Sequence, residues 1–263
     1  MASQRAKIEG LIRAGGFNRV QGDIRNPTLV ADLCGGVDAV CHLAVLPPGA
    51  PGAAETNIQG TQNVVDGCCR TDVEHLVYAS SMSVYDFLSP QYLPVDEAHP
   101  CQPLQDYGRE KLQGEALCMQ ACRTGELRVC ALRLAGIFGP GKPHGAAYVF
   151  ARAIMADEPV VIETDRAIDL LYVEDAARAL QLAIGAAETG VFNIGSGGSC
   201  ALSRLAEKIG QRLGQKPRIQ CRAEGNPFFF DISRARSILG YEPMPLDAAL
   251  DHFVPWVQKY VAN

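Results

Sequence analysis

A tyrosine and a lysine stand four residues apart, at Tyr107 and Lys111. The residues around them are typical of a helix, and side chains four apart share one helix face. A nearby ammonium favours phenolate over phenol, so we expect Lys111 to lower the pKa of Tyr107. The pair therefore predicts a proton donor or acceptor for a carbinol or carbonyl group. The alternative is a surface tyrosine and a solvated lysine on an amphipathic helix, which this spacing alone allows.

A serine cluster follows the predicted buried strand 76–80 and includes Ser80, Ser81 and Ser83. Ligands bind at the carboxyl ends of strands in parallel α/β sheets. A hydroxyl at this point can hold a substrate oxygen while the tyrosine moves the proton. A second apolar strand, 129–134, runs into a glycine-proline loop at 139–141.

The order strand, serine, tyrosine, lysine, strand and Gly-Pro-Gly loop resembles the extended short-chain dehydrogenase/reductase superfamily, in its NAD-dependent epimerase/dehydratase group. The resemblance covers nearly the whole chain and implies that Ser81, Tyr107 and Lys111 are catalytic. It implies substrate contacts at Ser81, Met82, Ser83, Tyr107 and Gly136. It also implies cofactor contacts at Asp23, Ile24, Leu43, Ala44, Val45, Asn57, Tyr107, Lys111, Gly136 and Ile137.

One part of the family pattern is missing. Members open with a strand, a glycine turn, a helix and a second strand, and the turn and helix hold the cofactor's pyrophosphate. Here residues 1–16 predict one short helix, after which the chain enters the family's third strand at 18–23. NAD(P) binding is therefore expected to be weak. The glycine turn at 195–198 superficially resembles a phosphate loop, but a lobe turn with Ser199 capping the next helix is the favoured interpretation.

The substrate side also departs from the sugar-nucleotide members. Gly136 stands where they carry an asparagine, and Ile168 stands where they carry an arginine, with Arg166 two residues away. The segment 228–230 is three phenylalanines where a third phosphate-binding arginine is expected. These losses point away from a nucleotide sugar. The phenylalanines predict either lobe core or an apolar substrate wall.

The predicted fold is α/β: a Rossmann-like parallel sheet with crossover helices, shortened at the N-terminus, plus a small C-terminal α/β lobe. The core is expected to span 1–165, with 166–196 contributing to it, and the lobe 197–263. We expect strand 18–23 to pair directly with strand 38–43, because a gap would expose unpaired backbone groups. The remaining strands are predicted at 75–80, 128–134 and 190–194, and the helices at 27–34, 57–70, 104–124, 145–156 and 173–187.

Composition narrows the function classes. The chain has 263 residues and a net charge of −5, which argues against a nucleic-acid partner. No apolar run approaches the length of a membrane span. The ten cysteines are scattered without zinc spacing, and the histidines form no metal cluster, so we expect reduced thiols, no metal site and a cytoplasmic protein.

Three functions remain open: an NAD(P)-dependent enzyme on a small-molecule substrate, a cofactor-free descendant that binds a ligand or only transfers protons, and a piece whose sheet another chain completes. The resemblance also implies a homodimer through helices 57–70 and 104–124. Their outward faces are expected to include Val64, Val65, Cys68, Leu117 and Ala121.

Overall fold

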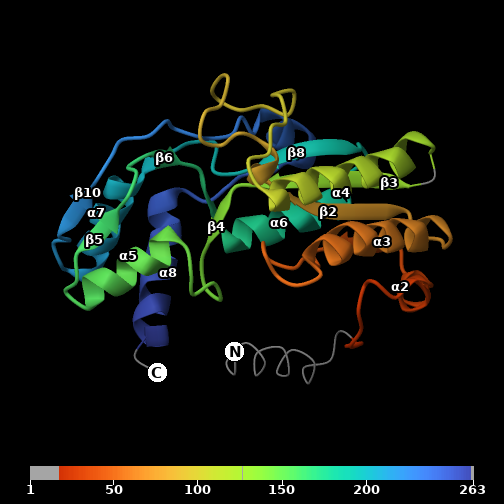
Figure 1. The fold of residues 1–263 in the computed structure, drawn as a ribbon, viewed down its shortest axis with the longest axis horizontal. Coiled ribbons are helices and arrows are strands. Elements are labelled where there is room, and N and C mark those ends of the chain that lie inside the picture. The colour runs from red at the N-terminus through yellow and green to blue at the C-terminus, as the bar shows by residue number, and fades with distance from the viewer. Residues whose placement is uncertain (1–17, 126, 262–263) are drawn as a thin grey trace.

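The computed structural model describes residues 18–125 and 127–261 (Figure 1). Its centre is a parallel four-stranded sheet in the order β1-β2-β3-β8. The strands are β1 (Ala39–His42), β2 (His75–Ser81), β3 (Arg128–Leu134) and β8 (Gly190–Ile194). The predicted class, a Rossmann-like α/β fold with a parallel sheet, is confirmed.

Helices cover both faces of this sheet. On one face, α3 (Gly60–Cys69) and α4 (Asp106–Arg123) pack on alternate strand residues such as Leu76 and Val129, and α2 (Pro27–Cys34) packs on α3. On the other face, α6 (Val173–Ile184) packs on the intervening residues such as Val77 and Leu132. Strand side chains alternate between the two faces, so both sets are apolar, as a sheet covered on both sides requires.

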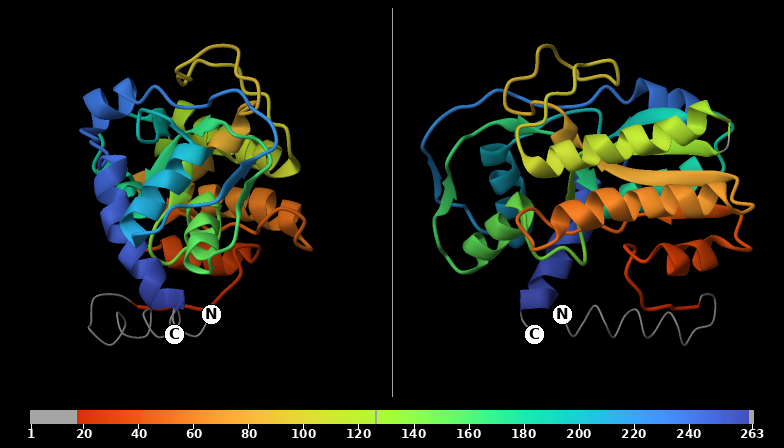
Figure 2. Two further views of the ribbon diagram at one scale, coloured as in Figure 1. Left: turned by 90° about the vertical axis from the view of Figure 1, so that its left-hand side faces the viewer. Right: turned by 45° about the vertical axis from the view of Figure 1, so that its right-hand side comes forward.

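A second cluster lies at the other end of the molecule (Figure 2). Three helices form it: α5 (Ala146–Met155), α7 (Leu202–Leu213) and α8 (Leu246–Val261). Short strand pairs complete it: β5 (Val160–Ile162) with β10 (Ile219–Cys221), and β6 (Ala167–Ile168) with β9 (Cys200–Ala201). A further pair, β4 (Gly136–Phe138) with β7 (Leu170–Tyr172), links the two ends.

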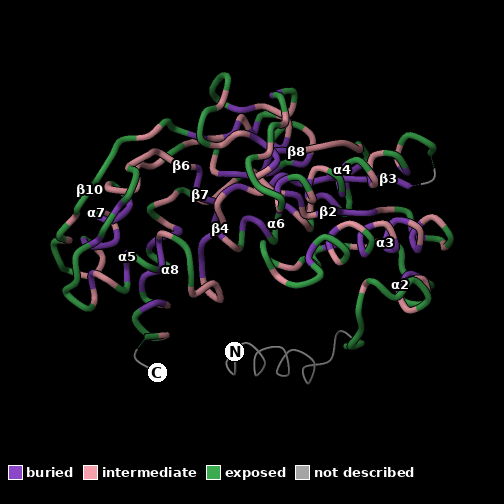
Figure 3. Tube along the Cα trace, in the orientation of Figure 1, coloured by how far each residue is buried: buried purple, intermediate pink, exposed green. Residues whose placement is uncertain are grey.

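The expected division places the core before residue 197 and the lobe after it. Helix α5 and strand β5 precede residue 197, yet they pack with α7 and α8. Conversely, Phe228, Phe230 and the turn η3 (Ala235–Leu239) follow it but pack in the core of the main sheet. Phe228 and Phe230 are each 1 % exposed, so they are core residues and form no wall of an open pocket. Buried stretches of the trace lie at both ends of the molecule (Figure 3).

The expected strand at 18–23 is wrong. These residues form no strand, and all six are exposed; β1 pairs only with β2 among the described residues. The segment is held elsewhere, because Asn63 donates a hydrogen bond to the Ile24 carbonyl (2.9 Å) and Ile24 lies against Gly60. These contacts hold Ile24 against α3, and the described polar segment before it does not pair with β1. The helix expected within residues 1–16 lies outside the described residues.

The expected dimer face is also wrong in its residues. Val64, Val65, Cys68 and Ala121 are buried in this chain's own core, between α3, α4 and the sheet. Their apolar character is explained by packing within the chain. They offer no support for contact with a second copy.

Candidate active site

The serine turn begins where β2 ends. Ser81 is the last residue of β2, and the short 3₁₀ turn η2 (Met82–Val84) follows it. The Ser81 hydroxyl accepts a hydrogen bond from the Ser83 amide (3.2 Å) and lies 3.2 Å from the Ser83 hydroxyl. This capping arrangement fixes the Ser81 oxygen at the carboxyl end of the central strands.

Helix α4 brings Tyr107 and Lys111 to the same place. Its first turn lies directly on η2, because a Cβ at Gly108 would collide with the Ser83 carbonyl oxygen. Lys111 is buried, and its ammonium donates to the Ala79 carbonyl (2.6 Å). Its nitrogen lies 5.9 Å from the centre of the Tyr107 ring. Glycine at position 108 therefore sets the approach of the tyrosine to the serine turn.

A pocket of about 560 Å³ collects these groups. It is large enough for a small ligand. The structure brings together nine of the residues expected from the sequence: Leu43, Val45, Ser81, Met82, Ser83, Tyr107, Lys111, Gly136 and Ile137. Sequence reasoning missed the other lining residues, which are Ala79, Ser80, Leu134, Ala135, Lys142, Val173, Ala176, Ala177 and Leu180.

The expected lowering of the Tyr107 pKa is not found. Burial raises the pKa of Tyr107, hydrogen bonding with Ser81 opposes that rise, and the charge of Glu110 adds to it. Lys111 does not contribute because its ammonium is directed at the Ala79 carbonyl and lies over the ring of Tyr78 (4.9 Å). Tyr107 therefore keeps its proton at neutral pH and is prepared to donate it.

Burial has a larger effect on two neighbouring bases. It lowers the pKa of Lys111 to about 8, against the opposing charges of Cys118, Glu115 and Glu110. Burial and the charge of Lys111 lower the pKa of His42 to about 4. His42 is therefore neutral, and its ring nitrogen lies 2.8 Å from the Thr61 hydroxyl, consistent with a packed residue.

Four of the expected cofactor residues do not line this pocket. Asp23 is exposed and accepts hydrogen bonds from Arg25 (2.6–3.1 Å), which lower the pKa of Asp23 to about 2. Asn57, in the π-helical turn η1 (Glu55–Gln59), is bonded to the backbone of Leu46 and donates to Glu110 (2.6 Å). It supports the floor of the site from behind. Ile24 and Ala44 complete the set outside the pocket.

A buried ion pair lies beneath the helix that carries Tyr107. Glu115 accepts from Arg133 at 2.7 Å and 3.0 Å, and the Ser80 hydroxyl also bonds to it. Arg133 donates to the Tyr85 hydroxyl (2.6 Å), which donates in turn to Asn193 (3.0 Å). The chain of contacts joins α4, β2, β3 and β8. It ties together the elements whose ends form the pocket.

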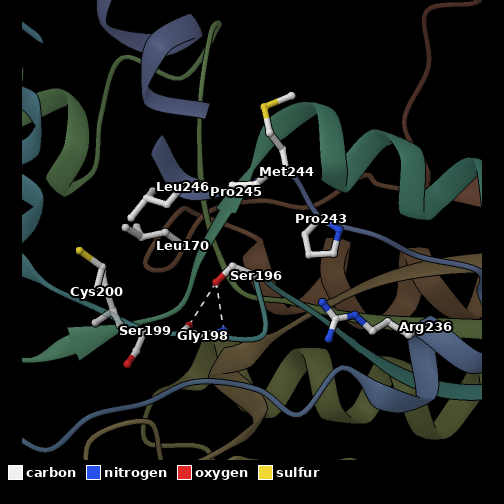
Figure 4. A pocket seen from close by; sticks show the side chains of 11 residues that line it. Leu170, Ser196, Gly198, Ser199, Cys200, Arg236, Pro243, Met244, Pro245 and Leu246 are labelled. Carbon is white, nitrogen blue, oxygen red and sulfur yellow. Dashed lines mark hydrogen bonds between the residues drawn. The ribbon is translucent and has the colours of Figure 1, made fainter. Parts of the chain in front are cut away.

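The glycine turn at 195–198 encloses one of the protein's own carboxylates. Asp169 accepts from the Ser196 amide (2.7 Å), the Ser196 hydroxyl (2.8 Å) and the Phe230 amide (3.1 Å). Close contact requires glycine, because a Cβ at Gly195 would meet the Asp169 oxygens. A separate pocket of about 330 Å³ lies beside this turn (Figure 4). The turn's donors are already used by Asp169, which supports the lobe-turn interpretation over a phosphate loop.

The described residues show neither a metal-ligand cluster nor a membrane-spanning helix. No group of three or more histidine, cysteine, aspartate or glutamate side chains could hold a metal ion in the described part. Within the same part, none of the helices has the length and apolar character that crossing a bilayer requires.

Comparisons with known proteins agree with the fold. A plant relative, 3beta-hydroxysteroid-dehydrogenase/decarboxylase isoform 1 of Arabidopsis thaliana, is 32% identical over 179 residues, which is 64% of this chain and 40% of that protein. The dTDP-glucose 4,6-dehydratase of Streptomyces niveus is 28% identical over 262 residues, 94% of this chain and 77% of that protein. The solved structure of MoeE5 in complex with UDP-glucuronic acid and NAD superposes with a TM-score of 0.83 at 28% identity, covering 94% of this chain and 87% of that one.

The family comparison covers most of the chain. The model of the family described as "NAD dependent epimerase/dehydratase family" matches residues 1–195 of this chain. This span contains the serine turn, the Tyr107 helix, and the strands β3 and β4. The chain belongs to the NAD dependent epimerase/dehydratase family.

Proposed function

We propose that this chain acts on a carbinol or carbonyl carbon of a small-molecule substrate, as an epimerase, dehydratase or dehydrogenase. The observation that carries the proposal is that Ser81, Tyr107 and Lys111 line one pocket at the carboxyl end of the sheet. The proposed roles are as follows. The Ser81 hydroxyl donates to the substrate oxygen, Tyr107 gives or takes its proton, and the Lys111 ammonium holds the ribose of the cofactor. NAD, when bound, supplies the hydride acceptor.

The residues present suit one half of such a cofactor. Leu43, Val45, Gly136 and Ile137 form apolar walls beside Tyr107, as the nicotinamide end requires. Asp23, expected at the adenine, is bonded to Arg25 outside this pocket. The glycine turn at 195–198 holds Asp169 and does not line the pocket. The fit is therefore good at the reactive end and poor at the phosphates.

The experiment that tests this proposal is turnover with NAD and a panel taken from the relatives' chemistry. UDP-glucose, UDP-glucuronic acid, dTDP-glucose and a 3β-hydroxysteroid would each be incubated with the protein and followed by product analysis. Turnover of one of them that requires added NAD supports the proposal. A protein that turns over a substrate equally well without NAD supports the alternative below.

We expect NAD(H) to bind with a millimolar rather than a micromolar dissociation constant. Each charge-assisted hydrogen bond to a phosphate is worth about 1.5–3 kcal/mol, so losing several weakens binding by roughly three orders of magnitude. Isothermal titration calorimetry with NADH measures this directly. A micromolar dissociation constant would contradict the prediction and would indicate that the chain binds the dinucleotide as ordinary NAD-dependent enzymes do.

A second function rests on a specific observation. Asp23 is engaged by Arg25, and the glycine turn at 195–198, whose sequence resembles a phosphate loop, already binds Asp169. A cofactor-free protein that binds a ligand, or that only transfers protons through Tyr107, fits these facts. Turnover without any nicotinamide cofactor distinguishes it from the first proposal.

We also expect a cytoplasmic homodimer, although its interface cannot use Val64, Val65, Cys68 or Ala121, which are buried in this chain's own core. All ten cysteines are free thiols, which suits a reducing compartment. The solvent side of α4 carries Ala116 and the half-buried Leu117 between polar residues. Multi-angle light scattering should give a mass near twice 28.2 kDa at micromolar concentration. A mass near that of one chain would rule the dimer out.

A further inference from the structure

The charges around the active-site pocket are unbalanced. Among the described residues that line it, Lys111 and Lys142 carry ammonium groups, and none is an aspartate or a glutamate. Tyr107 is the remaining titratable group, and burial keeps it neutral. Most other lining side chains are apolar, so few polar groups screen the two positive charges. A pocket of this kind favours a ligand that brings negative charge.

The two lysines are engaged differently. Lys111 is 4 % exposed and belongs to the catalytic set. Lys142 is half-buried and donates a hydrogen bond to the Ile137 carbonyl (2.7 Å). An ammonium has three donors, and no carboxylate of the described residues forms an ion pair with this one. Burying a cation without an anionic partner is unfavourable, and burial accordingly lowers the pKa of Lys142.

The backbone holds Lys142 in this position. After β4, the chain turns through Gly139 (φ 145°) and Gly141 (φ 91°), two conformations that favour glycine. The Lys142 amide donates to the Gly139 carbonyl (3.3 Å), which closes the turn. The turn sends the side chain back along β4 to the Ile137 carbonyl, and Lys142 lines the active-site pocket there. The glycine-proline loop noted in the sequence therefore delivers a cation to the site.

We propose that Lys142 is a specificity-determining residue that binds an oxyanion of the ligand in the active-site pocket. Two ligands could bring this group: a substrate with a carboxylate, such as a uronic acid, or the phosphate of the nicotinamide cofactor. The proposal rests on the proposed function for the identity of the pocket. It adds that the site selects ligands that carry this oxyanion over ligands that lack it.

Binding measurements with two variants test the proposal. Lys142→Met removes the charge and keeps the length, and Lys142→Arg keeps the charge. Lys216→Met, at an exposed position after α7, is the matched control because it removes the same net charge away from the pocket. The probes are UDP-glucuronic acid, UDP-glucose and NADH. The two sugars differ by a carboxylate in place of a hydroxymethyl group.

If the oxyanion is the substrate's carboxylate, wild-type protein and Lys216→Met should prefer UDP-glucuronic acid over UDP-glucose by about tenfold or more. Lys142→Met should lose this preference, and Lys142→Arg should restore it. If the oxyanion is the cofactor's phosphate, Lys142→Met should weaken NADH binding by a similar factor and leave the sugars unaffected. Equal binding of all three probes by wild type and Lys142→Met overturns the proposal.

A second measurement covers the case in which the sugars bind too weakly for calorimetry. Reductive ¹³C-methylation gives each lysine its own NMR signal, and the Lys142→Met variant identifies the one in question. That signal should shift on adding UDP-glucuronic acid or NADH at millimolar concentration, and by less with UDP-glucose, which lacks the carboxylate. No shift with either UDP-glucuronic acid or NADH overturns the proposal. The methylation signal does not depend on turnover, so inactive protein with a responsive Lys142 would sink the proposed function alone.

Discussion

Replacing Tyr107 by phenylalanine is expected to reduce turnover by roughly 10²–10⁴-fold, the usual contribution of general acid–base catalysis. Tyr107 is the one titratable pocket residue whose pKa burial has raised, so it carries the proton to be donated. The other two titratable groups that line the described pocket are lysines. Steady-state kinetics with the substrate found in the panel above measures the effect.

The control is Tyr92→Phe. Tyr92 is 43% exposed, and its hydroxyl donates to Asp96 (2.8 Å) in the loop before α4. This variant loses the same atom and should keep wild-type turnover. A Tyr107→Phe protein that is as active as Tyr92→Phe would remove Tyr107 from the mechanism.

Replacing Glu115 by alanine is expected to cost about 3–5 kcal/mol of the free energy of unfolding. The side chains of Arg133 and Glu115 are 6% and 4% exposed, so the change leaves a guanidinium buried without its anion. Ser80 loses a hydrogen-bond partner as well. Urea denaturation followed by circular dichroism gives the value.

The same strand offers a matched control. Arg128 pairs with Glu74 at 2.5 Å, but these side chains are 46% and 66% exposed. Glu74→Ala should cost less than about 1 kcal/mol, because water screens the pair. The double variant Glu115→Leu with Arg133→Met should recover much of the loss, since no charge remains buried. Similar losses of unfolding free energy for Glu115→Ala and Glu74→Ala would show that the buried pair contributes no more to stability than the exposed pair.

The elements that form the site could be predicted because their signals are local. The apolar run 76–80 and the strand 128–134 match β2 and β3 closely, and the predicted helix 104–124 matches α4. Once parallel strands and crossover helices are assigned, their carboxyl ends meet at one edge of the sheet. Ser81, Tyr107 and Lys111 were therefore expected together, and one pocket contains them.

The rest depends on contacts that no local pattern reports. The strand at 18–23 was expected from its place in the family pattern, but the contacts of Ile24 with Asn63 and Gly60 decide where the chain runs. Val64 and Cys68 were assigned to a dimer face because periodicity identifies an apolar stripe without naming its partner. Lys142 was missed because its position depends on the conformations of Gly139 and Gly141. The Tyr107 pKa was misjudged because spacing predicts a shared helix face but not the direction of the ammonium.

Among the described residues β1 is an edge strand, so it has fewer backbone hydrogen bonds to neighbouring strands than β2 and β3 have. β2 and β3 each have a strand on both sides, whereas β1 has one neighbour in the described chain. Segments with fewer backbone partners open locally at lower free energy than the whole molecule unfolds. Leu43 and Val45, which follow this strand, are walls of the active-site pocket. A ligand binds there only when β1 and these wall residues are in place. Its apparent affinity is therefore lower when a larger fraction of molecules has this edge locally unfolded. Ligand binding and the local folding of β1 are then coupled at this end of the sheet.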